Sequence, residues 1–273
     1  MKPRPIDYAQ PDTIDEALAL LAEYGDDARV LAGGQTLIAM LNLRLLEPAI
    51  LIDITRIAEL DAIREIDGSI EVGAAVTQNK LMAWPALAEK LSLVAGALPF
   101  VGHFQTRNKG TVCGSIAHAD PAAELPLTLA MLEGEVVLHS RRGRRVLPAR
   151  DFQRGMLATA RAPDELITAV RFPVARGGAA VHEVARRHGD FAVVAIGALA
   201  ADGHIRVGVA GVADRPAVAP IATSDVSAIT DSVERLAREL EGYDDIHASA
   251  RMRRDILRRL APLVIEEAMR CAA

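Results

Sequence analysis

Two segments that carry closely spaced glycines restrict what this chain can fold into more than any other feature. In the first, a short apolar run over residues 29–32 ends at Gly33-Gly34, and a helical pattern of apolar residues follows over 36–45. This order predicts a strand, a tight turn and a helix, because glycine accepts the backbone angles that a sharp reversal needs. A buried strand predicted over residues 50–54 completes a βαβ-like unit of about 55 residues.

The first glycine segment, residues 31–37, has the chemistry of an anion cradle. Glycines let the backbone approach a phosphate closely, and the free N–H groups at a helix start carry partial positive charge. Thr36 adds a hydroxyl donor. An ordinary strand-to-helix turn explains the same spacing, and the segment matches neither the GxGxxG nor the P-loop pattern. From spacing alone, both interpretations stay open.

The second segment, residues 106–126, runs for 21 residues without clear periodicity. A loop of this length inside a compact domain is unusual, and such loops are often functional. Its candidate ligand contacts are small residues, which suit close wrapping, and carboxylates, which accept hydrogen bonds from sugar hydroxyls: Thr111, Gly114, Ser115, Asp120 and Glu124. Two phosphate-cradle candidates on one chain suggest a pyrophosphate ligand.

The remaining periodicities predict three small α+β units with breaks near residues 58 and 176. The expected domains are 1–58, 59–175 and 176–273, with a glycine-rich linker at 174–179. The expected helices cover 13–24, a segment from 77, 86–98, 226–240 and 247–269. The expected strands cover 62–66, 70–73, 135–139, 145–147, 166–172, 180–185, 193–200 and 205–212. Asp202-Gly203 between the last two is a strong hairpin signal.

Composition excludes several classes of protein. With 273 residues, of which 51% are hydrophobic, the chain has ample apolar surface for one or more cores. Its two cysteines, Cys113 and Cys271, cannot build a Cys-rich zinc site, a four-thiolate iron–sulfur cluster or a disulfide framework, so any such centre must lie on another chain. The net charge of −5 argues against a nucleic-acid partner. No apolar run is long enough for a membrane span and the start lacks a signal-type core, so we expect a soluble, cytoplasmic protein.

The other reactive side chains give weaker signals. Cys113, His118 and Asp120 lack a fourth partner for a metal and a third group for a nucleophile, so we predict neither a metal site nor a catalytic residue. A cluster of arginines at an expected hairpin tip has two interpretations, a docking site for an acidic partner or a solvated hairpin end: Arg141, Arg142, Arg144 and Arg145.

Together the two glycine segments resemble those of the FAD-binding medium subunit of the xanthine dehydrogenase and carbon monoxide dehydrogenase family of molybdenum hydroxylases. The family's AGGxS motif is matched by residues 32–36, with Thr36 in place of serine. Its RNxGTxGGxIAxxDPxxD motif is matched over 107–124, although Cys113 stands where glycine is common. The later pattern over residues 186–190 is similar to the family's RRxGD, and the resemblance covers nearly the whole chain.

The resemblance implies an α+β fold. Two N-terminal α/β subdomains of the vanillyl-alcohol-oxidase (PCMH-like) type would hold FAD, and a C-terminal domain of antiparallel strands and helices would follow them. The implied cofactor contacts are Ala32, Gly33, Gly34, Gln35, Thr36, Leu37, Thr111, Val112, Gly114, Ser115, Asp120, Glu124 and Phe191. Among these, Phe191 would approach the flavin and Glu124 would be the acidic contact.

The resemblance also implies partners and a role. A small subunit with two [2Fe–2S] clusters and a large molybdopterin subunit would join this chain in a hetero-oligomer, a dimer of heterotrimers. Electrons from the clusters would pass to the flavin and then to an external acceptor. Two alternatives remain open from the sequence, a self-sufficient flavin oxidase or dehydrogenase and a non-catalytic nucleotide-binding regulator.

Overall fold

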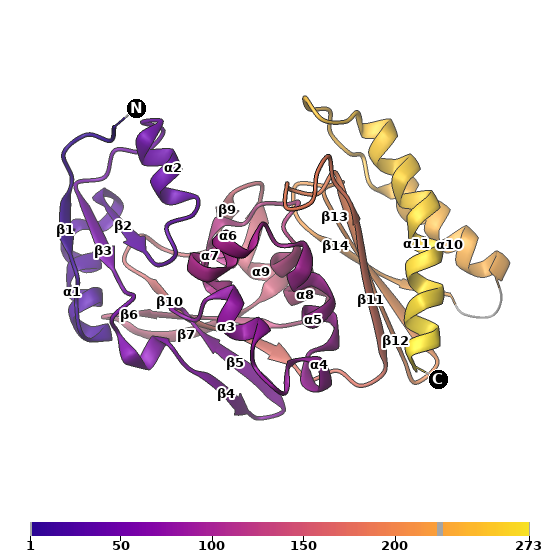
Figure 1. The fold of residues 1–273 in the computed structure, drawn as a ribbon, viewed down its shortest axis with the longest axis horizontal. Helices are drawn as coiled ribbons and strands as arrows, with labels where there is room; N and C mark the ends of the chain where they lie inside the picture. The colour runs from indigo at the N-terminus through magenta and orange to yellow at the C-terminus, as the bar shows by residue number, and fades with distance from the viewer. Residues whose placement is uncertain (1, 223–225, 273) are drawn as a thin grey trace.

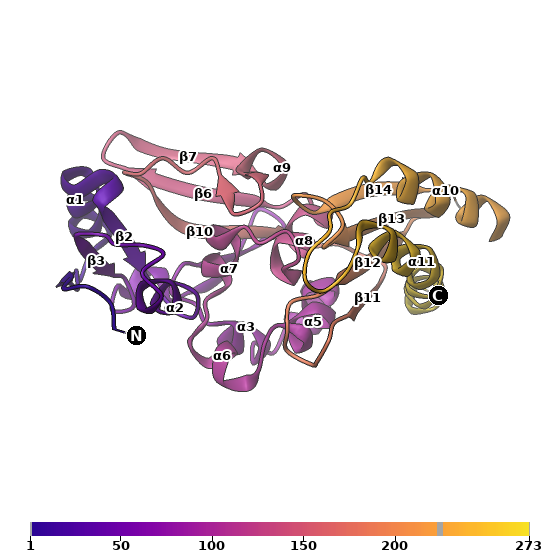
Figure 2. The same ribbon diagram turned by 90° about the horizontal axis from the view of Figure 1, so that it is seen from above.

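The computed structural model describes residues 2–222 and 226–272, which form three larger β-sheets in a row, a small two-stranded sheet and helices packed around them. The N-terminal and C-terminal sheets lie at opposite ends of the molecule, and the largest sheet lies between them (Figures 1 and 2). The expected domain limits at residues 58 and 176 fall between these sheets and stay predictions. Among the described residues, no helix combines the length and apolar character that crossing a membrane requires.

The N-terminal sheet contains the predicted βαβ arrangement. Its strands are parallel in the order β1-β3-β2, and the glycine turn follows β2. The first helix begins where the Thr13 hydroxyl accepts the N–H of Glu16, a side-chain cap typical of helix starts. The elements are β1 (Asp7–Ala9), α1 (Ile14–Tyr24), β2 (Ala28–Leu31), α2 (Leu37–Asn42) and β3 (Ile50–Asp53).

The central sheet is antiparallel and has the order β4-β5-β10-β6-β7, beside a small two-stranded sheet, β8-β9. The strands of these two sheets are β4 (Ile63–Ile66), β5 (Ser69–Gly73), β6 (Glu135–Ser140), β7 (Gly143–Pro148), β8 (Gln153–Gly155), β9 (Ala158–Thr159) and β10 (Leu166–Pro173). The helices between them are α3 (Gln78–Met82), α4 (Leu87–Lys90), α5 (Ser92–Ala97), α6 (Phe104–Lys109), α7 (Val112–His118), α8 (Glu124–Met131) and α9 (Ala149–Phe152).

The C-terminal sheet is an antiparallel meander, β11-β12-β13-β14, with α10 and α11 against it (Figure 1). The predicted hairpin turn is confirmed, because Asp202 and Gly203 both have positive φ, at 49° and 75°. The elements are β11 (Gly178–Val184), β12 (Val194–Ala201), β13 (His204–Ala210), β14 (Ala217–Ile221), α10 (Val226–Glu239) and α11 (Ala250–Ala272).

Three expectations about the elements were wrong. The segment 106–126 is not a loop, because it contains the end of α6, all of α7 and the start of α8. The expected helix over 86–98 is broken into α4 and α5 at Leu91. The strands β1 and β14 were missed, since β1 is short and exposed and β14 contains Pro220, which is typical of an edge strand.

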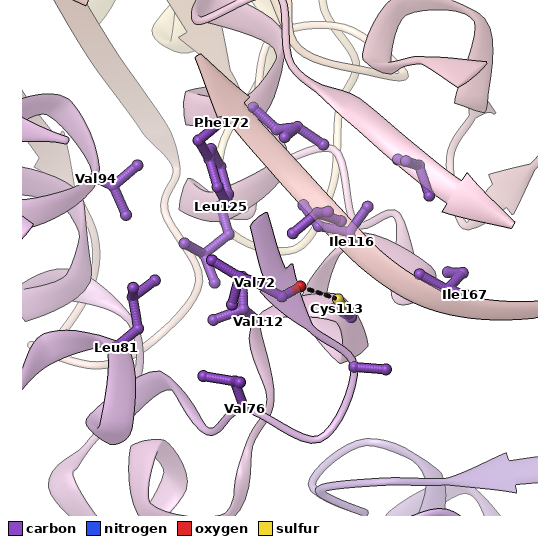
Figure 3. Packing of buried hydrophobic residues seen from close by; sticks show 14 of the residues in the cluster. Val72, Val76, Leu81, Val94, Val112, Cys113, Ile116, Leu125, Ile167 and Phe172 are labelled. Carbon is purple, nitrogen blue, oxygen red and sulfur yellow. Dashed lines mark hydrogen bonds between the residues drawn. The ribbon is translucent and has the colours of Figure 1, made fainter. Parts of the chain in front are cut away.

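The start of α7 is anchored in the apolar core of the central part. Figure 3 shows Val112 and Ile116 beside Val72 of β5, and all three side chains are nearly inaccessible to solvent. The Cys113 thiol donates a hydrogen bond to the carbonyl oxygen of Val72 at 3.5 Å. Burial of this helix face fixes the second glycine segment firmly against the sheet.

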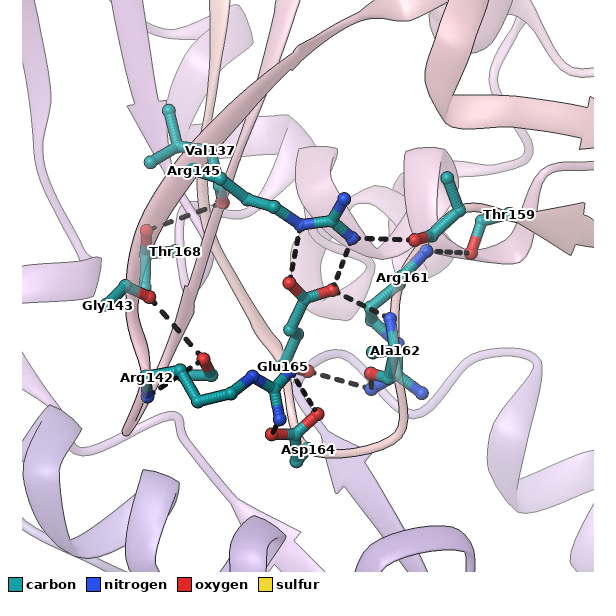
Figure 4. A network of polar contacts seen from close by, with 12 residues as sticks. Val137, Arg142, Gly143, Arg145, Thr159, Arg161, Ala162, Asp164, Glu165 and Thr168 are labelled. Carbon is teal, nitrogen blue, oxygen red and sulfur yellow. Dashed lines mark hydrogen bonds and ion pairs between the residues drawn. The ribbon is translucent and has the colours of Figure 1, made fainter.

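The arginine-rich tip of the β6–β7 hairpin is paired within the chain. Arg145 donates from Nε and Nη2 to both carboxylate oxygens of Glu165, at 2.6 and 2.7 Å, and Arg142 pairs with Asp164 (Figure 4). The tip therefore folds back on the loop before β10. These pairs favour a structural role for the arginines over docking of an acidic partner.

Candidate cofactor cleft

A cleft of about 610 Å³ lies where the two glycine segments meet. Volumes of this size are typical of cofactor and small-molecule sites. Its walls come from four stretches of chain, mainly 29–37, 101–124, 157–167 and 189–191. Segments far apart in the sequence therefore form one site.

Contact between the two glycine segments is direct and requires glycine. A Cβ atom on Gly33 would come within 2.3 Å of the Lys109 carbonyl oxygen and 2.7 Å of the Gly110 Cα. Gly34 has a different requirement, since its φ of +67° lies in the left-handed region. The first segment thus combines a close backbone approach with a sharp turn.

The turn from β2 to α2 presents a row of unused donors. The N–H groups of Gly33, Gly34, Gln35, Thr36 and Leu37 have no hydrogen-bond acceptor among the described residues, and the first N–H in this stretch with one is that of Ile38, which donates to Gly34. Five successive free N–H groups beside a cleft form a concave anion-binding surface. The arrangement fits a phosphate or diphosphate.

The second glycine segment offers fewer donors than the first. The N–H of Val112 donates to the Val76 carbonyl, that of Gly114 to the Thr111 hydroxyl, and that of Ser115 to the Thr111 carbonyl. The remaining donors are the N–H groups of Thr111 and Cys113 and the Ser115 hydroxyl, for which the described residues supply no acceptor. The two turns therefore contribute unequally to the anion-binding surface.

One end of the cleft carries a buried carboxyl group. Glu124 begins α8 and is only 4% exposed, yet it lines the cleft. Burial raises the pKa of Glu124 to about 7, and the negative charge of Asp120 adds to this effect. Phe191 also lines the cleft and is 58% exposed, so a planar ligand group can reach it.

Most of the residues named from the sequence line the cleft, and two do not. The Val112 side chain is buried in the core and its N–H is bonded to Val76, while the Asp120 carboxylate accepts the N–H of Ala122 at 2.8 Å. The residues that line it are Ala32, Gly33, Gly34, Gln35, Thr36, Leu37, Thr111, Gly114, Ser115, Glu124 and Phe191.

Sequence reasoning missed several other residues of the cleft wall. Arg29, Gln78, Arg161 and Ile167 all line the cleft. Burial lowers the pKa of Arg161, whose guanidinium donates to the carbonyl of Glu165. No local pattern marks these positions; Ile167, for example, lies in β10, which joins the central sheet by pairing with strands distant in sequence.

The thiol of the second segment, Cys113, is buried and hydrogen-bonded. Burial raises the pKa of the Cys113 thiol, which is the opposite of what a nucleophile needs. Among the described residues, no group of three or more histidine, cysteine, aspartate or glutamate side chains is placed to hold a metal ion.

The FAD-binding domain in molybdopterin dehydrogenase matches residues 4–175 of this sequence, which include both glycine segments and most of the cleft. This chain belongs to that family. FAD is therefore its cofactor, and the size of the cleft and the row of free N–H groups fit it.

Relatives in this family are named as subunits of dehydrogenases and hydroxylases. The chain is 35% identical to the nicotine 6-hydroxylase medium subunit of Paenarthrobacter nicotinovorans, over 98% of this chain and 99% of that one. It is 41% identical to the 6-hydroxypseudooxynicotine dehydrogenase complex subunit alpha of the same organism, over 71% of this chain. That second match spans 66% of the relative, a little under two thirds of its length.

A solved structure from the family confirms the expected FAD-binding α+β fold. A chain of carbon monoxide dehydrogenase from Hydrogenophaga pseudoflava, an enzyme form that lacks the Mo-pyranopterin moiety of its cofactor, aligns with a TM-score of 0.94. The alignment covers 100% of both chains at 30% identity. The C-terminal part, which lies beyond the matched family domain, is thus shared as well.

Proposed function

We propose that this chain is the flavoprotein subunit of a molybdenum hydroxylase and passes electrons from [2Fe–2S] clusters on a partner subunit through FAD to an external acceptor. Flavin suits this role because it accepts electrons singly and releases them in pairs, while the protein fixes its position. Hydroxylation of the substrate would take place at molybdenum on another chain. The named relatives, which are dehydrogenase and hydroxylase subunits, support this assignment.

The observation that carries the proposal is the row of free N–H groups over residues 33–37. In this proposal they hold the FAD diphosphate, with help from the Thr111 N–H and the Ser115 hydroxyl, while Gly114 leaves room for the ligand beside them. Glu124 and Phe191 contact the flavin half. Val112 and Asp120 support these contacts indirectly. Val112 anchors α7, and Asp120 closes the turn before α8.

The proposed partners are a small [2Fe–2S] subunit and a large molybdopterin subunit, assembled as a dimer of heterotrimers in the cytoplasm. The cysteine content supports partners of this kind, since two cysteines cannot ligate such clusters. Neither the cleft nor the cysteines favour a self-sufficient oxidase. The Cys113 thiol points to the Val72 carbonyl and is poorly placed for a covalent flavin link.

Gly34→Asp tests the proposal. The new side chain brings a negative charge to the anion-binding turn, and its Cβ would lie 3.1 Å from Leu31 and Ile38 side-chain atoms at a φ of +67°. We expect the purified variant to lose at least nine tenths of its flavin absorbance at 450 nm, roughly 1.4 kcal/mol or more of binding free energy. The wild-type circular dichroism spectrum should be retained.

Gly68→Asp is the matched control for this substitution. Gly68 also has a positive φ, +75°, but a Cβ atom added there would have no other atom within 4 Å, and the residue does not line the cleft. This variant should keep its flavin. Full flavin content in Gly34→Asp would contradict the proposed cradle, and equal loss in both variants would point to a folding defect.

A further inference from the structure

A buried glutamine, Gln78, lies beside the place where the two glycine segments meet. It is the first residue of α3, it is only 5% exposed, and it lines the cleft. Its side-chain oxygen, Oε1, is buried and has no hydrogen-bond donor among the described residues. A buried acceptor without a donor destabilises a folded chain, so its presence in the cleft wall calls for an explanation.

Gln78 donates two hydrogen bonds to the second glycine segment. Its backbone N–H donates to the carbonyl oxygen of Gly110 at 2.8 Å, and its side-chain Nε2 donates to the carbonyl oxygen of Thr111 at 3.5 Å. The preceding residue, Thr77, forms an isolated antiparallel bridge with Thr111. The start of α3 is therefore joined to the backbone of residues 110–111 by both main-chain and side-chain contacts.

The pairing with Thr111 explains why the side-chain oxygen of Gln78 has no donor. Only the amide NH₂ group can donate to the Thr111 carbonyl, and this orientation leaves Oε1 beside Gly110. The N–H of Gly110 is already used, because it donates to the Thr106 carbonyl at 2.6 Å. Gln78 thus satisfies one end of its amide group at the expense of the other.

Gly110 lies close to both the Gln78 amide and the first turn. A Cβ atom added to Gly110 would lie 3.2 Å from Gln78 Oε1, and one added to Gly33 would lie 2.7 Å from the Cα atom of Gly110. The contact between the two glycine segments is therefore supported by the amide group of Gln78. A change in this amide group should reach the anion-binding turn through Gly110.

We propose that Gln78 is a positioning residue for the cofactor, which holds Gly110 and Thr111 against the first turn while its own oxygen stays unpaired. The inference rests on the proposed FAD cradle, to which both glycine segments contribute. If Gln78 served the fold alone, an apolar residue of the same length would make the chain less stable. In the proposed role, that residue makes the chain more stable and FAD binding weaker.

Gln78→Met tests the proposal, because methionine keeps the length of the side chain and removes the amide group. Without FAD, the urea midpoint should rise, since the unpaired oxygen is gone and the Thr111 carbonyl still accepts the N–H of Ser115 at 3.3 Å. FAD affinity, measured by quenching of flavin fluorescence, should fall roughly fivefold or more. A lower urea midpoint or an unchanged FAD affinity would overturn the inference.

Gln153→Met is the matched control. Gln153 is also a buried glutamine, 8% exposed, but it does not line the cleft, and its Nε2 donates to the Ala119 carbonyl at 2.9 Å. This variant should lower the urea midpoint and leave FAD affinity unchanged. A fall in the urea midpoint in both variants would mean that the unpaired oxygen of Gln78 does not destabilise the chain, and the inference would fail.

A double variant tests whether Gln78 acts through Gly110. Gly33→Ala and Gln78→Met both disturb the contact at Gly110, so their combined loss of FAD affinity should be smaller than the product of the two separate losses. A combined loss equal to that product would overturn the inference. These experiments measure FAD binding alone, so a complex that binds FAD and fails to pass electrons to an acceptor would contradict only the proposed function.

Discussion

At the scale of single residues, the two adjacent glycines of the first turn are needed for different reasons. Gly34 is required for its backbone angle, whereas Gly33 is required because the Lys109–Gly110 backbone passes directly over it. The sequence shows both glycines and their place between a strand and a helix. It does not show what Gly33 touches, because Gly110 is distant in the chain.

Gly33→Ala should separate the two glycine segments without adding charge. A Cβ at 2.3 Å from a carbonyl oxygen forces the backbones apart, so we expect FAD affinity to fall at least tenfold, about 1.4 kcal/mol. Quenching of flavin fluorescence during titration measures this. Gly96→Ala is the control, since its Cβ would find only ordinary contacts at 3.7 Å. Unchanged affinity in Gly33→Ala would mean that the segments need not touch.

Glu124 should make the chain less stable as pH rises. Its pKa is about 7 in the folded chain, above the ordinary glutamate value of 4.5 expected when the chain is unfolded, so the folded state binds the proton more tightly. The contribution of Glu124 to the free energy of unfolding is therefore complete below pH 4.5. It declines between pH 4.5 and 7, by up to about 3 kcal/mol. Glu124→Gln removes this decline.

Urea unfolding at several pH values checks whether Glu124 lowers the free energy of unfolding as pH rises. Relative to wild type, Glu124→Gln should gain stability steadily from pH 4.5 to 7. A difference that does not change with pH would show that Glu124 is ionised at its ordinary pKa in the folded protein.

At the scale of elements, the sequence was informative where apolar runs are bounded by turn residues. The β2–turn–α2 unit, the β6–β7 hairpin and the first three strands of the C-terminal meander were predicted from periodicity and turn residues. The helices α7 and α8 were missed. In α8 nearly every residue is buried, so the apolar and polar faces that mark a surface helix are absent.

The buried Arg253 joins α11 to the C-terminal sheet. It is 1% exposed, donates to the carbonyls of Val193 and Gly211 at 2.7 and 2.8 Å, and pairs with Asp245 at 2.6 Å. Its guanidinium also lies 4.3 Å from the centre of the Tyr243 ring. One side chain therefore links a helix, two strand ends and a loop.

Arg253→Met should destabilise the chain by about 3–5 kcal/mol, because it leaves buried acceptors without a partner. Chemical denaturation measures the loss. Arg251→Met, at a side chain that is 88% exposed, should change stability by less than about 0.5 kcal/mol. If the two variants are equally stable, the buried guanidinium does not hold α11 in place.

At the scale of the whole molecule, the cleft lies beside the central sheet, and the C-terminal sheet reaches it through Gly189 and Phe191. The family and the cofactor could be inferred from two motifs, because these motifs are local in sequence. The places of Arg161 and Ile167 in the cleft could not, since they depend on the order of strands in the sheet. The sequence bears on partners only through its two cysteines, which are too few to ligate an iron–sulfur cluster.

Metal and flavin analysis of the native assembly tests the proposed role. The isolated chain should contain FAD and no iron, whereas the co-purified complex should contain FAD, iron and molybdenum. In a complex with Gly34→Asp, substrate should still reduce the clusters while transfer to the external acceptor falls at least tenfold. Unimpaired transfer to the acceptor would exclude this flavin from the electron path.

A crystal structure of the FAD-bound chain tests the central claim most directly. The diphosphate oxygens should lie about 2.7–3.2 Å from several of the backbone nitrogens of residues 33–37. A diphosphate bound elsewhere, with those N–H groups facing water or bonded to protein, would contradict the account.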